Sequence, residues 1–224
     1  MNQLQSQVIL TLRDDLLTWY DQHGRNLPWR AKHVKDINVY YTVVSEFMLQ
    51  QTTVKTVIPY FYDFIKKFPT FKDLAQASLQ EVMHQWQGLG YYRRAKALWE
   101  SAKSLAVSYP SSDKDWKNLP GFGPYPIAAV RSMAFQEPFI ALDGNINRIM
   151  SRIFCDHDMK SLGLKSQQFA HPTRSGDVNQ ALMDVGSSIC LPKNPLCLLC
   201  PLQKGCMAYE QGCIHEYPKP KIKK

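Results

Sequence analysis

The stretch NLPGFGPYPIAAVRSMAF, residues 118–135, is the part of the sequence from which the fold is best argued. It begins with a short turn, Leu119 to Pro124, and continues with the apolar spacing of a helix. Glycine at the turn positions Gly121 and Gly123 allows unusual backbone angles and close approach of another backbone. The start of the following helix leaves N–H groups unpaired, which favours an anion there. The stretch therefore predicts a tight turn between two helices, with a phosphate-sized anion site as the functional interpretation and a purely structural turn as the alternative.

Outward from this turn the apolar periodicity is helical nearly everywhere, and no strand alternation is found. Ser78 and Glu81 match a capping box, which predicts the start of a helix. Other helices are expected up to about Gly24 and over residues 39–50, 53–67, 92–108, 124–135, 145–154 and 179–188. The sequence therefore predicts an all-α fold with short connections.

Composition and charge exclude several classes of protein. The chain has 224 residues, 45% of them hydrophobic, so it is not wholly disordered. No apolar run reaches the roughly eighteen residues of a membrane span, and the start lacks a secretory pattern. We expect a cytoplasmic protein whose six cysteines form no disulfides. The net charge of +8, half of it in the final segment 218–224, suits a polyanionic partner.

A group of cysteines near the end of the chain indicates a metal centre. Its members are Cys190, Cys197, Cys200 and Cys206, separated by six, two and five residues. Zinc usually takes two short Cys-x2-Cys pairs, and this segment has one, so a four-iron, four-sulfur cluster fits better than zinc. Cys155 and Cys213 fall outside this spacing and are interpreted as a buried thiol and a surface thiol.

Two carboxylates stand in apolar surroundings. Glu46 interrupts the apolar segment 43–49, and burial there would disfavour its ionised form, as suits a general acid. A buried ion pair with an arginine is its alternative role. Asp143 follows an apolar run and precedes a predicted helix, and by spacing alone an ordinary helix N-cap is favoured. A pair of carboxylates is the chemistry of glycosidic bond cleavage.

Taken together, these motifs resemble those of the MutY-type adenine DNA glycosylases, members of the helix-hairpin-helix, iron–sulfur superfamily. The resemblance extends from about Leu16 to Cys213 and covers the family's catalytic region, without its C-terminal lesion-reading domain. The motifs that carry it are Leu27–Arg30, Ser45–Thr52, Gly88–Tyr92, Leu119–Gly123, Leu142–Asn145 and the four-cysteine loop.

The resemblance implies a fold of two all-α lobes. Residues 25–139 would form a six-helix lobe with the helix-hairpin-helix. Residues 1–24 and 140–213 would form a lobe that holds a [4Fe-4S] cluster, and residues 214–224 a basic tail.

The resemblance also implies a reaction, the hydrolysis of the N-glycosidic bond of adenine mispaired with 8-oxoguanine or guanine. The adenine must leave the base stack first, since its bond is inaccessible in the duplex. Glu46 would protonate the flipped adenine, and Asp143, with Asn145 beside it, would stabilise positive charge on the sugar. Tyr125 would lie near that sugar. It replaces the lysine nucleophile of endonuclease III relatives, which implies a monofunctional enzyme.

Further residues are implied to contact the base or the DNA. The adenine pocket would be walled by Trp29, Arg30 and Leu49. The DNA-binding residues would be Gln50, Gln51, Thr52, Leu89, Gly90, Tyr91, Gly121 and Gly123, of which Gln51, Leu89 and Tyr91 would wedge into the helix. Gly121 and Gly123 would grip the phosphate backbone, with a cation at the hairpin.

The partner implied is double-stranded DNA containing a mismatched or lesion-paired adenine, bound by a monomer at the nucleoid and with no membrane involved. Without the lesion-reading domain, a weaker preference for 8-oxoguanine over guanine is expected. Three alternatives remain: a glycosylase acting on thymine or uracil mispaired with guanine, a non-catalytic iron–sulfur DNA-binding module, and a zinc-stabilised DNA-binding protein.

Overall fold

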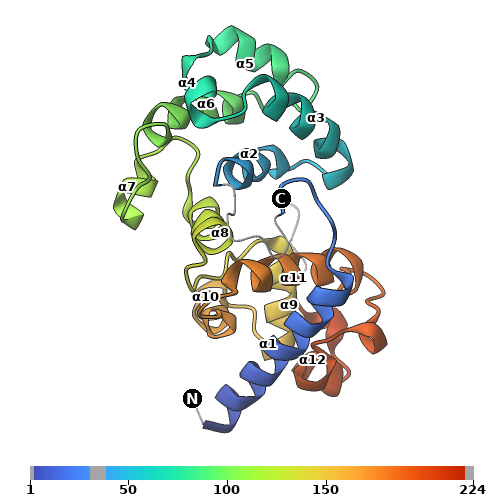
Figure 1. The fold of residues 1–224 in the computed structure, drawn as a ribbon. Helices are drawn as coiled ribbons and strands as arrows, with labels where there is room; N and C mark the ends of the chain where they lie inside the picture. The colour runs from blue at the N-terminus through green and yellow to red at the C-terminus, as the bar shows by residue number, and fades with distance from the viewer. Residues whose placement is uncertain (1–2, 31–38, 220–224) are drawn as a thin grey trace. The chain divides into compact units, whose positions relative to one another are not determined.

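The computed structural model describes residues 3–30 and 39–219. Within those two ranges every regular element is an α-helix or a 3-10 helix, which confirms the predicted all-α fold (Figure 1). None of the helices in this part of the chain is long and apolar enough to cross a membrane. The chain divides into two compact units, Asn26–Phe135 and Met1–Arg25 with Gln136–Lys224. We call them the central unit and the terminal unit, and each is described separately.

In the central unit, the helices pack around a core that is rich in aromatic side chains. Its described part contains α2 (Val39–Leu49), α3 (Val54–Lys67), α4 (Phe71–Gln76), α5 (Leu79–Gln85), α6 (Arg93–Leu105), α7 (Asp113–Lys117) and α8 (Pro124–Phe135). Helix α2 packs against α3, α6 and α8. Because it is covered on several sides, eight of its eleven residues are buried, which explains its almost uninterrupted apolar sequence. Phe47, Trp86 and Trp116 are fully buried in this core.

Short helices account for the main differences from the expected elements. The capping box at Ser78 and Glu81 is confirmed, with both reciprocal hydrogen bonds present at the start of α5. Helices α4 and α7 were not predicted, because six and five residues are too few to display a helical period. The hydroxyls of Thr70 and Ser112 cap them, and these capping residues were the available signal.

The terminal unit is built around three packed helices. Its described elements are α1 (Gln3–His23), α9 (Gly144–Phe154), α10 (Met159–Ser166), η1 (Gln167–Phe169), α11 (Ser175–Ser188), η2 (Cys197–Leu199), η3 (Gln203–Gly205), α12 (Met207–Glu210) and η4 (Ile214–Glu216). Helix α11 packs against both α1 and α9, and α12 also packs against α9 (Figure 1). Helix α11 begins four residues earlier than predicted, and α10 was not predicted.

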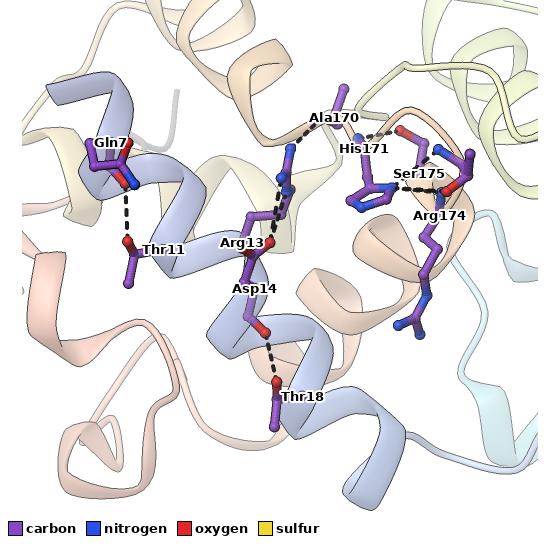
Figure 2. A network of polar contacts seen from close by, with 10 residues as sticks. Gln7, Thr11, Arg13, Asp14, Thr18, Ala170, His171, Arg174 and Ser175 are labelled. Carbon is purple, nitrogen blue, oxygen red and sulfur yellow. Dashed lines mark hydrogen bonds and ion pairs between the residues drawn. The ribbon is translucent and has the colours of Figure 1, made fainter. Parts of the chain in front are cut away.

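Polar contacts fix α1 to the segment that leads into α11. Figure 2 shows Arg13 reaching from α1 to the carbonyl of Ala170, with Nη1 and the oxygen 3.2 Å apart. In the next turn the backbone N–H of His171 donates to Ser175 Oγ at 3.0 Å, and that of Arg174 donates to His171 Nδ1 at 3.0 Å. The N-terminal helix is thereby joined to a segment 157 residues further along the chain.

The boundaries of the units differ slightly from those expected. Residues 136–139 belong to the terminal unit, because the side chain of Gln136 accepts the N–H of Gly176 and the carbonyl of Phe139 accepts from Asn179. Within the expected basic tail, Tyr217 stacks on His157 with ring centroids 4.3 Å apart. Residues 220–224 of that tail lie outside the described residues.

Candidate functional site

The glycine turn, Leu119 to Pro124, lies between α7 and α8 and packs against Phe47 of α2. Gly121 has φ +82°, which favours glycine, and a Cβ there would lie 2.6 Å from Phe47 Cε1. Phe122 is buried against Phe47, with ring centroids 5.3 Å apart. Gly123 does not adopt a positive φ, so the prediction of unusual backbone angles holds at Gly121 alone. The turn is held in position by its own aromatic residue.

The expected supply of N–H groups at the start of α8 is smaller than predicted. Pro124 and Pro126 stand in the first turn of that helix, and proline has no N–H. Among the first three helical positions only Tyr125 retains one. Any anion held at this turn would therefore rely on the amides of Tyr125 and the preceding turn rather than on a full helix end.

Glu46 lies in the middle of α2 and is 6% exposed. Its neighbours in the helix, Ser45 and Phe47, are also buried, and the Ser45 hydroxyl donates to the carbonyl of Thr42 at 2.9 Å. Among the described residues only one other acidic side chain is buried, Asp184, and it forms an ion pair with Arg25 at 2.6 Å. A buried carboxyl is uncommon in a helix that is packed on several sides.

The expected base-pocket residues all belong to the central unit. Trp29 packs edge-on against Phe61, with ring centroids 5.2 Å apart, and is half-buried. Leu49 is the last residue of α2 and is partly buried against the same core as Trp29. Arg30 is half-buried, and its N–H donates to the carbonyl of Leu27 at 2.9 Å. Trp29 and Leu49 thus pack against the same hydrophobic core as α2, the helix that carries Glu46.

Two loops of the central unit present the residues expected to enter DNA. Gln51 has φ 60° and Tyr91 has φ 48°, a backbone conformation uncommon outside glycine. Gln51 is exposed, and Tyr91 is 61% exposed. Leu89 departs from the expectation, because it is 5% exposed and packs in the core. Gln51 and Tyr91 are accordingly available to a partner, as is the neighbouring Tyr92, which is 45% exposed.

Arg94 joins these two loops and was not anticipated. Its Nη1 donates to the carbonyls of Met48, at 3.0 Å, and Gln50, and its Nη2 to those of Leu89 and Gly90, each at 3.3 Å. Burial lowers the pKa of this guanidinium. In the sequence Arg94 looked like any charged residue on a helix surface. A guanidinium has five donors in a planar fork, which is what allows one side chain to bind both loops.

In the terminal unit Asp143 caps α9. Its Oδ1 accepts the N–H of Ile146 at 2.6 Å, and its Oδ2 accepts from Asn145 Nδ2 at 3.3 Å. Burial raises the pKa of this carboxyl, and the hydrogen bonds from Ile146 and Asn145 partly oppose that rise. The N-cap role is therefore present, and the carboxyl also carries a raised pKa that a simple cap does not require.

Two arginines on α9, Arg148 and Arg152, contact the segment that carries the cysteines. Arg148 also contacts Asn145, which lies beside Asp143. Arg148 Nη2 donates to Asn145 Oδ1 at 3.0 Å, and its Nε donates to the carbonyl of Cys190 at 2.7 Å. One turn further on, Arg152 Nη1 donates to the sulfur of Cys190 at 3.2 Å. Neither arginine was singled out in the sequence, since their partners are mostly backbone carbonyls far along the chain.

The four cysteines with ligand spacing line one cavity in the terminal unit. They are Cys190, Cys197, Cys200 and Cys206, and Arg152 lines the cavity with them. Burial raises the pKa of Cys200 to about 12 and also raises the pKa of Cys197 and Cys206. Within the described residues no three His, Cys, Asp or Glu side chains are close enough to hold a single metal ion. The four cysteine side chains therefore share one cavity.

One protein-family model matches the part of the sequence that contains this turn. A model described as HhH-GPD superfamily base excision DNA repair protein matches residues 44–169, which is more than half of the chain. The chain belongs to this superfamily.

Two curated relatives and one solved structure are similar to the chain over most of its length. The adenine DNA glycosylase of Rattus norvegicus is 40% identical, covering 94% of this chain and 44% of the relative. That of Buchnera aphidicola subsp. Schizaphis graminum is 38% identical, covering 93% of this chain and 62% of the relative. A solved structure of a thermostable thymine-DNA glycosylase has a TM-score of 0.81 and 27% identity, covering 92% of this chain and 99% of its own. The chain thus spans only part of the length of both adenine glycosylases.

Proposed function

We propose that this chain is the catalytic region of an adenine DNA glycosylase. It would hydrolyse the N-glycosidic bond of adenine paired with 8-oxoguanine or guanine in double-stranded DNA. The observation that carries the proposal is the buried Glu46 on α2, in a chain that aligns over more than nine tenths of its length with adenine DNA glycosylases.

The proposed reaction begins with adenine turned out of the duplex, because its glycosidic bond is otherwise out of reach. Glu46 then donates a proton to the base, which makes adenine a better leaving group. Asp143, as a carboxylate, stabilises the positive charge that develops on the sugar, and Asn145 orients it through the 3.3 Å hydrogen bond. A water molecule completes the hydrolysis at the sugar carbon and leaves an abasic site.

Tyr125 supports a monofunctional reaction. In the resembling endonuclease III enzymes, a lysine at this place attacks the sugar and forms a Schiff base. A phenol cannot form that intermediate, so strand cleavage would not accompany base removal. Tyr125 lies in the first turn of α8, directly after the glycine turn.

We further propose how the duplex is held. Trp29, Arg30 and Leu49 would wall the pocket for the turned-out base. Gln51 and Tyr91, both exposed, would replace lost stacking in the duplex. Remaining contacts would come from the backbone of the two loops and the glycine turn, at Gln50, Thr52, Gly90, Gly121 and Gly123, with a cation at that turn. The protein would act as a monomer at the nucleoid.

The four cysteines fit an iron–sulfur cluster better than a zinc ion. In a [4Fe-4S] cluster each thiolate binds a different iron, so the sulfurs surround a shared space without closing on one ion. Cys190, Cys197, Cys200 and Cys206 line such a shared cavity. Bound there, the cluster would link the four thiolates through iron–sulfur bonds and so stabilise the fold of the loop that carries them. Arg152 would orient Cys190. Brown colour and about four iron atoms per chain are expected, whereas a colourless preparation containing zinc would refute this part of the proposal.

A thymine glycosylase is the second candidate, favoured by the structural match to the thermostable thymine-DNA glycosylase. One experiment separates the two. Single-turnover reactions are run on labelled duplexes with A opposite 8-oxoguanine, A opposite G, and T opposite G, each with and without alkali.

Breaks in the adenine strand that appear only after alkali are the expected result. Breaks in the thymine strand would establish the second candidate, breaks without alkali would refute the monofunctional reaction, and the absence of any break would leave a DNA-binding module. The ratio of rates on the first two duplexes measures the preference of this chain for 8-oxoguanine.

A further inference from the structure

Two cysteines outside the cavity-lining set meet in the terminal unit. Cys155 caps the C-terminus of α9 directly after Phe154, in a left-handed backbone conformation with φ 45°, and Cys213 follows α12. Their sulfur atoms are 4.0 Å apart, although the residues are separated by 58 positions in the chain. The sequence had assigned one to the interior and the other to the surface, and both are instead half-buried beside each other.

The surroundings hold these two thiols in place. The side-chain oxygen of Gln211 lies 3.8 Å from the sulfur of Cys155 and 3.9 Å from that of Cys213. Arg152 Nε donates to the carbonyl of Tyr217 at 3.0 Å. This contact docks the segment after Cys213 against the end of α9 without using either thiol, so the pair does not depend on its own contact to stay together.

A neighbouring pair of thiols can bind a soft metal or form a disulfide. A structural metal site usually takes four protein ligands, and these two thiols supply two. A disulfide needs its sulfurs about 2.05 Å apart. The two sulfurs, 4.0 Å apart, must therefore approach each other by about 2 Å, and changes of the two side-chain torsions produce movements of that size. The geometry therefore favours a disulfide over a metal.

We propose that Cys155 and Cys213 form a reversible disulfide, a redox modification site distinct from the four cavity-lining cysteines. The oxidant would be a small-molecule disulfide such as oxidised glutathione. One thiolate attacks it and releases one reduced thiol, giving a mixed disulfide. The second cysteine then attacks the protein-bound sulfur and releases the other reduced thiol. Two protein S–H groups are oxidised, and one disulfide is reduced to two thiols.

This bond would connect the two segments that flank the cysteine-lined cavity. Helix α9 carries Arg152, which contacts Cys190, and the segment that ends at Cys213 begins just after Cys206. Tying the end of α9 to that segment restrains opening of the cavity. The disulfide itself does not depend on the proposed glycosylase activity, and only its effect on a bound cluster rests on the proposed cofactor.

The test is a map of the disulfide in the intact protein as purified. The protein is equilibrated with mixtures of oxidised and reduced glutathione, quenched with acid and alkylated after denaturation. Digestion with trypsin and with a protease that cuts after glutamate separates Cys206 from Cys213, because Glu210 lies between them. We expect a peptide linking Cys155 to Cys213, lost in both Cys155→Ser and Cys213→Ser.

Full alkylation of Cys155 and Cys213 at every glutathione ratio, or linkage of Cys155 to Cys206, would overturn the proposal. A second readout is the rate of iron release to a chelator, which we expect to be several-fold slower in the oxidised than in the reduced protein. Equal rates would refute the restraint on the cavity. If the protein binds no iron the proposed cofactor fails, and the peptide map still decides the disulfide.

Discussion

Asp143 combines a structural contact with a proposed chemical role. Its Oδ1 accepts the N–H of Ile146 and caps α9, which is an ordinary use of aspartate. A cap alone gains from the negative charge of the carboxylate near the helix start. Burial nevertheless raises the pKa of Asp143, so its ionised form is disfavoured. The two roles can be separated, because asparagine caps helices about as well as aspartate.

Replacement of Asp143 by asparagine should therefore slow adenine release strongly and spare the fold. Because the folded pKa of Asp143 lies above its unfolded value, the stability it contributes is present at low pH and lost as pH rises through the folded pKa. The Asn variant lacks this loss and keeps the cap, so near neutral pH its free energy of unfolding should equal or exceed that of the wild type. Adenine release should slow by about 10²- to 10³-fold. Urea unfolding and single-turnover kinetics measure both, and an active variant would contradict the assigned role.

A change at Asn145 should alter the pH dependence. Hydrogen bonds from Asn145 lower the pKa of Asp143, and Asn145→Ala removes the one from its side chain. The pKa of Asp143 should then rise further, so the carboxylate is protonated at higher pH. In a pH profile of adenine release, the fall in rate on the acid side should move to higher pH. A profile that coincides with that of the wild type would show that Asn145 does not act through Asp143.

At the scale of residues, the sequence singles out the two acids, whose roles stay a prediction, and does not single out the arginines. Glu46 and Asp143 stand out because a carboxylate in an apolar segment is uncommon. Arg94 and Arg148 do not, because each stands among other polar residues. Their partners are largely backbone carbonyls, which every residue possesses and no sequence pattern marks. Whether the sequence alone predicts a role therefore depends on how unusual the residue is for its surroundings.

At the scale of elements, hydrophobic pattern and caps were sufficient for the longer helices. Helices α2, α3, α8 and α9 are found within a few residues of their expected ranges. Helices α4 and α7 escaped because they are shorter than two turns. The glycine turn was predictable as a turn, yet its anchoring by Phe47 depends on packing that the sequence does not show.

The glycine turn provides a matched pair of substitutions. Gly121→Ala would place a Cβ 2.6 Å from Phe47 at a positive φ, so it should destabilise the protein by about 1–3 kcal/mol. Gly163→Ala lies within α10, where nothing stands within 4 Å of the added carbon, and should stabilise it by about 0.5–1 kcal/mol. Urea unfolding compares the two. Equal effects would show that the turn is not held as described.

Arg94 provides the second test at this scale. Lysine has three donors on one ammonium and cannot bind the carbonyls of both loops, so Arg94→Lys should loosen residues 50–52 and 89–91. We expect about 1–3 kcal/mol of lost stability and weaker binding of a mispaired duplex. Lys96→Arg, on the exposed face of the same helix, is the control and should change neither. Undiminished DNA affinity in Arg94→Lys would show that this tie does not support the loops.

At the scale of the whole molecule, the proposed machinery draws on both units. The central unit contributes Glu46, the glycine turn and the two loops, and the terminal unit contributes Asp143 and the four cysteines. The superfamily was predictable from the sequence, because several of its motifs follow one another in one order. The connection of α9 to Cys190 was not, because it joins segments about forty residues apart.

The most direct test of the central claim is the amount of free adenine released in one turnover from a duplex with adenine opposite 8-oxoguanine. Wild type is compared with Glu46→Gln and with Glu81→Gln, since Glu81 is an exposed capping residue in which glutamine preserves the cap. We predict release by wild type and Glu81→Gln at equal rates, and release by Glu46→Gln slower by about 10²- to 10⁴-fold. Adenine release by Glu46→Gln at the wild-type rate, or no adenine from any of the three, would contradict the account.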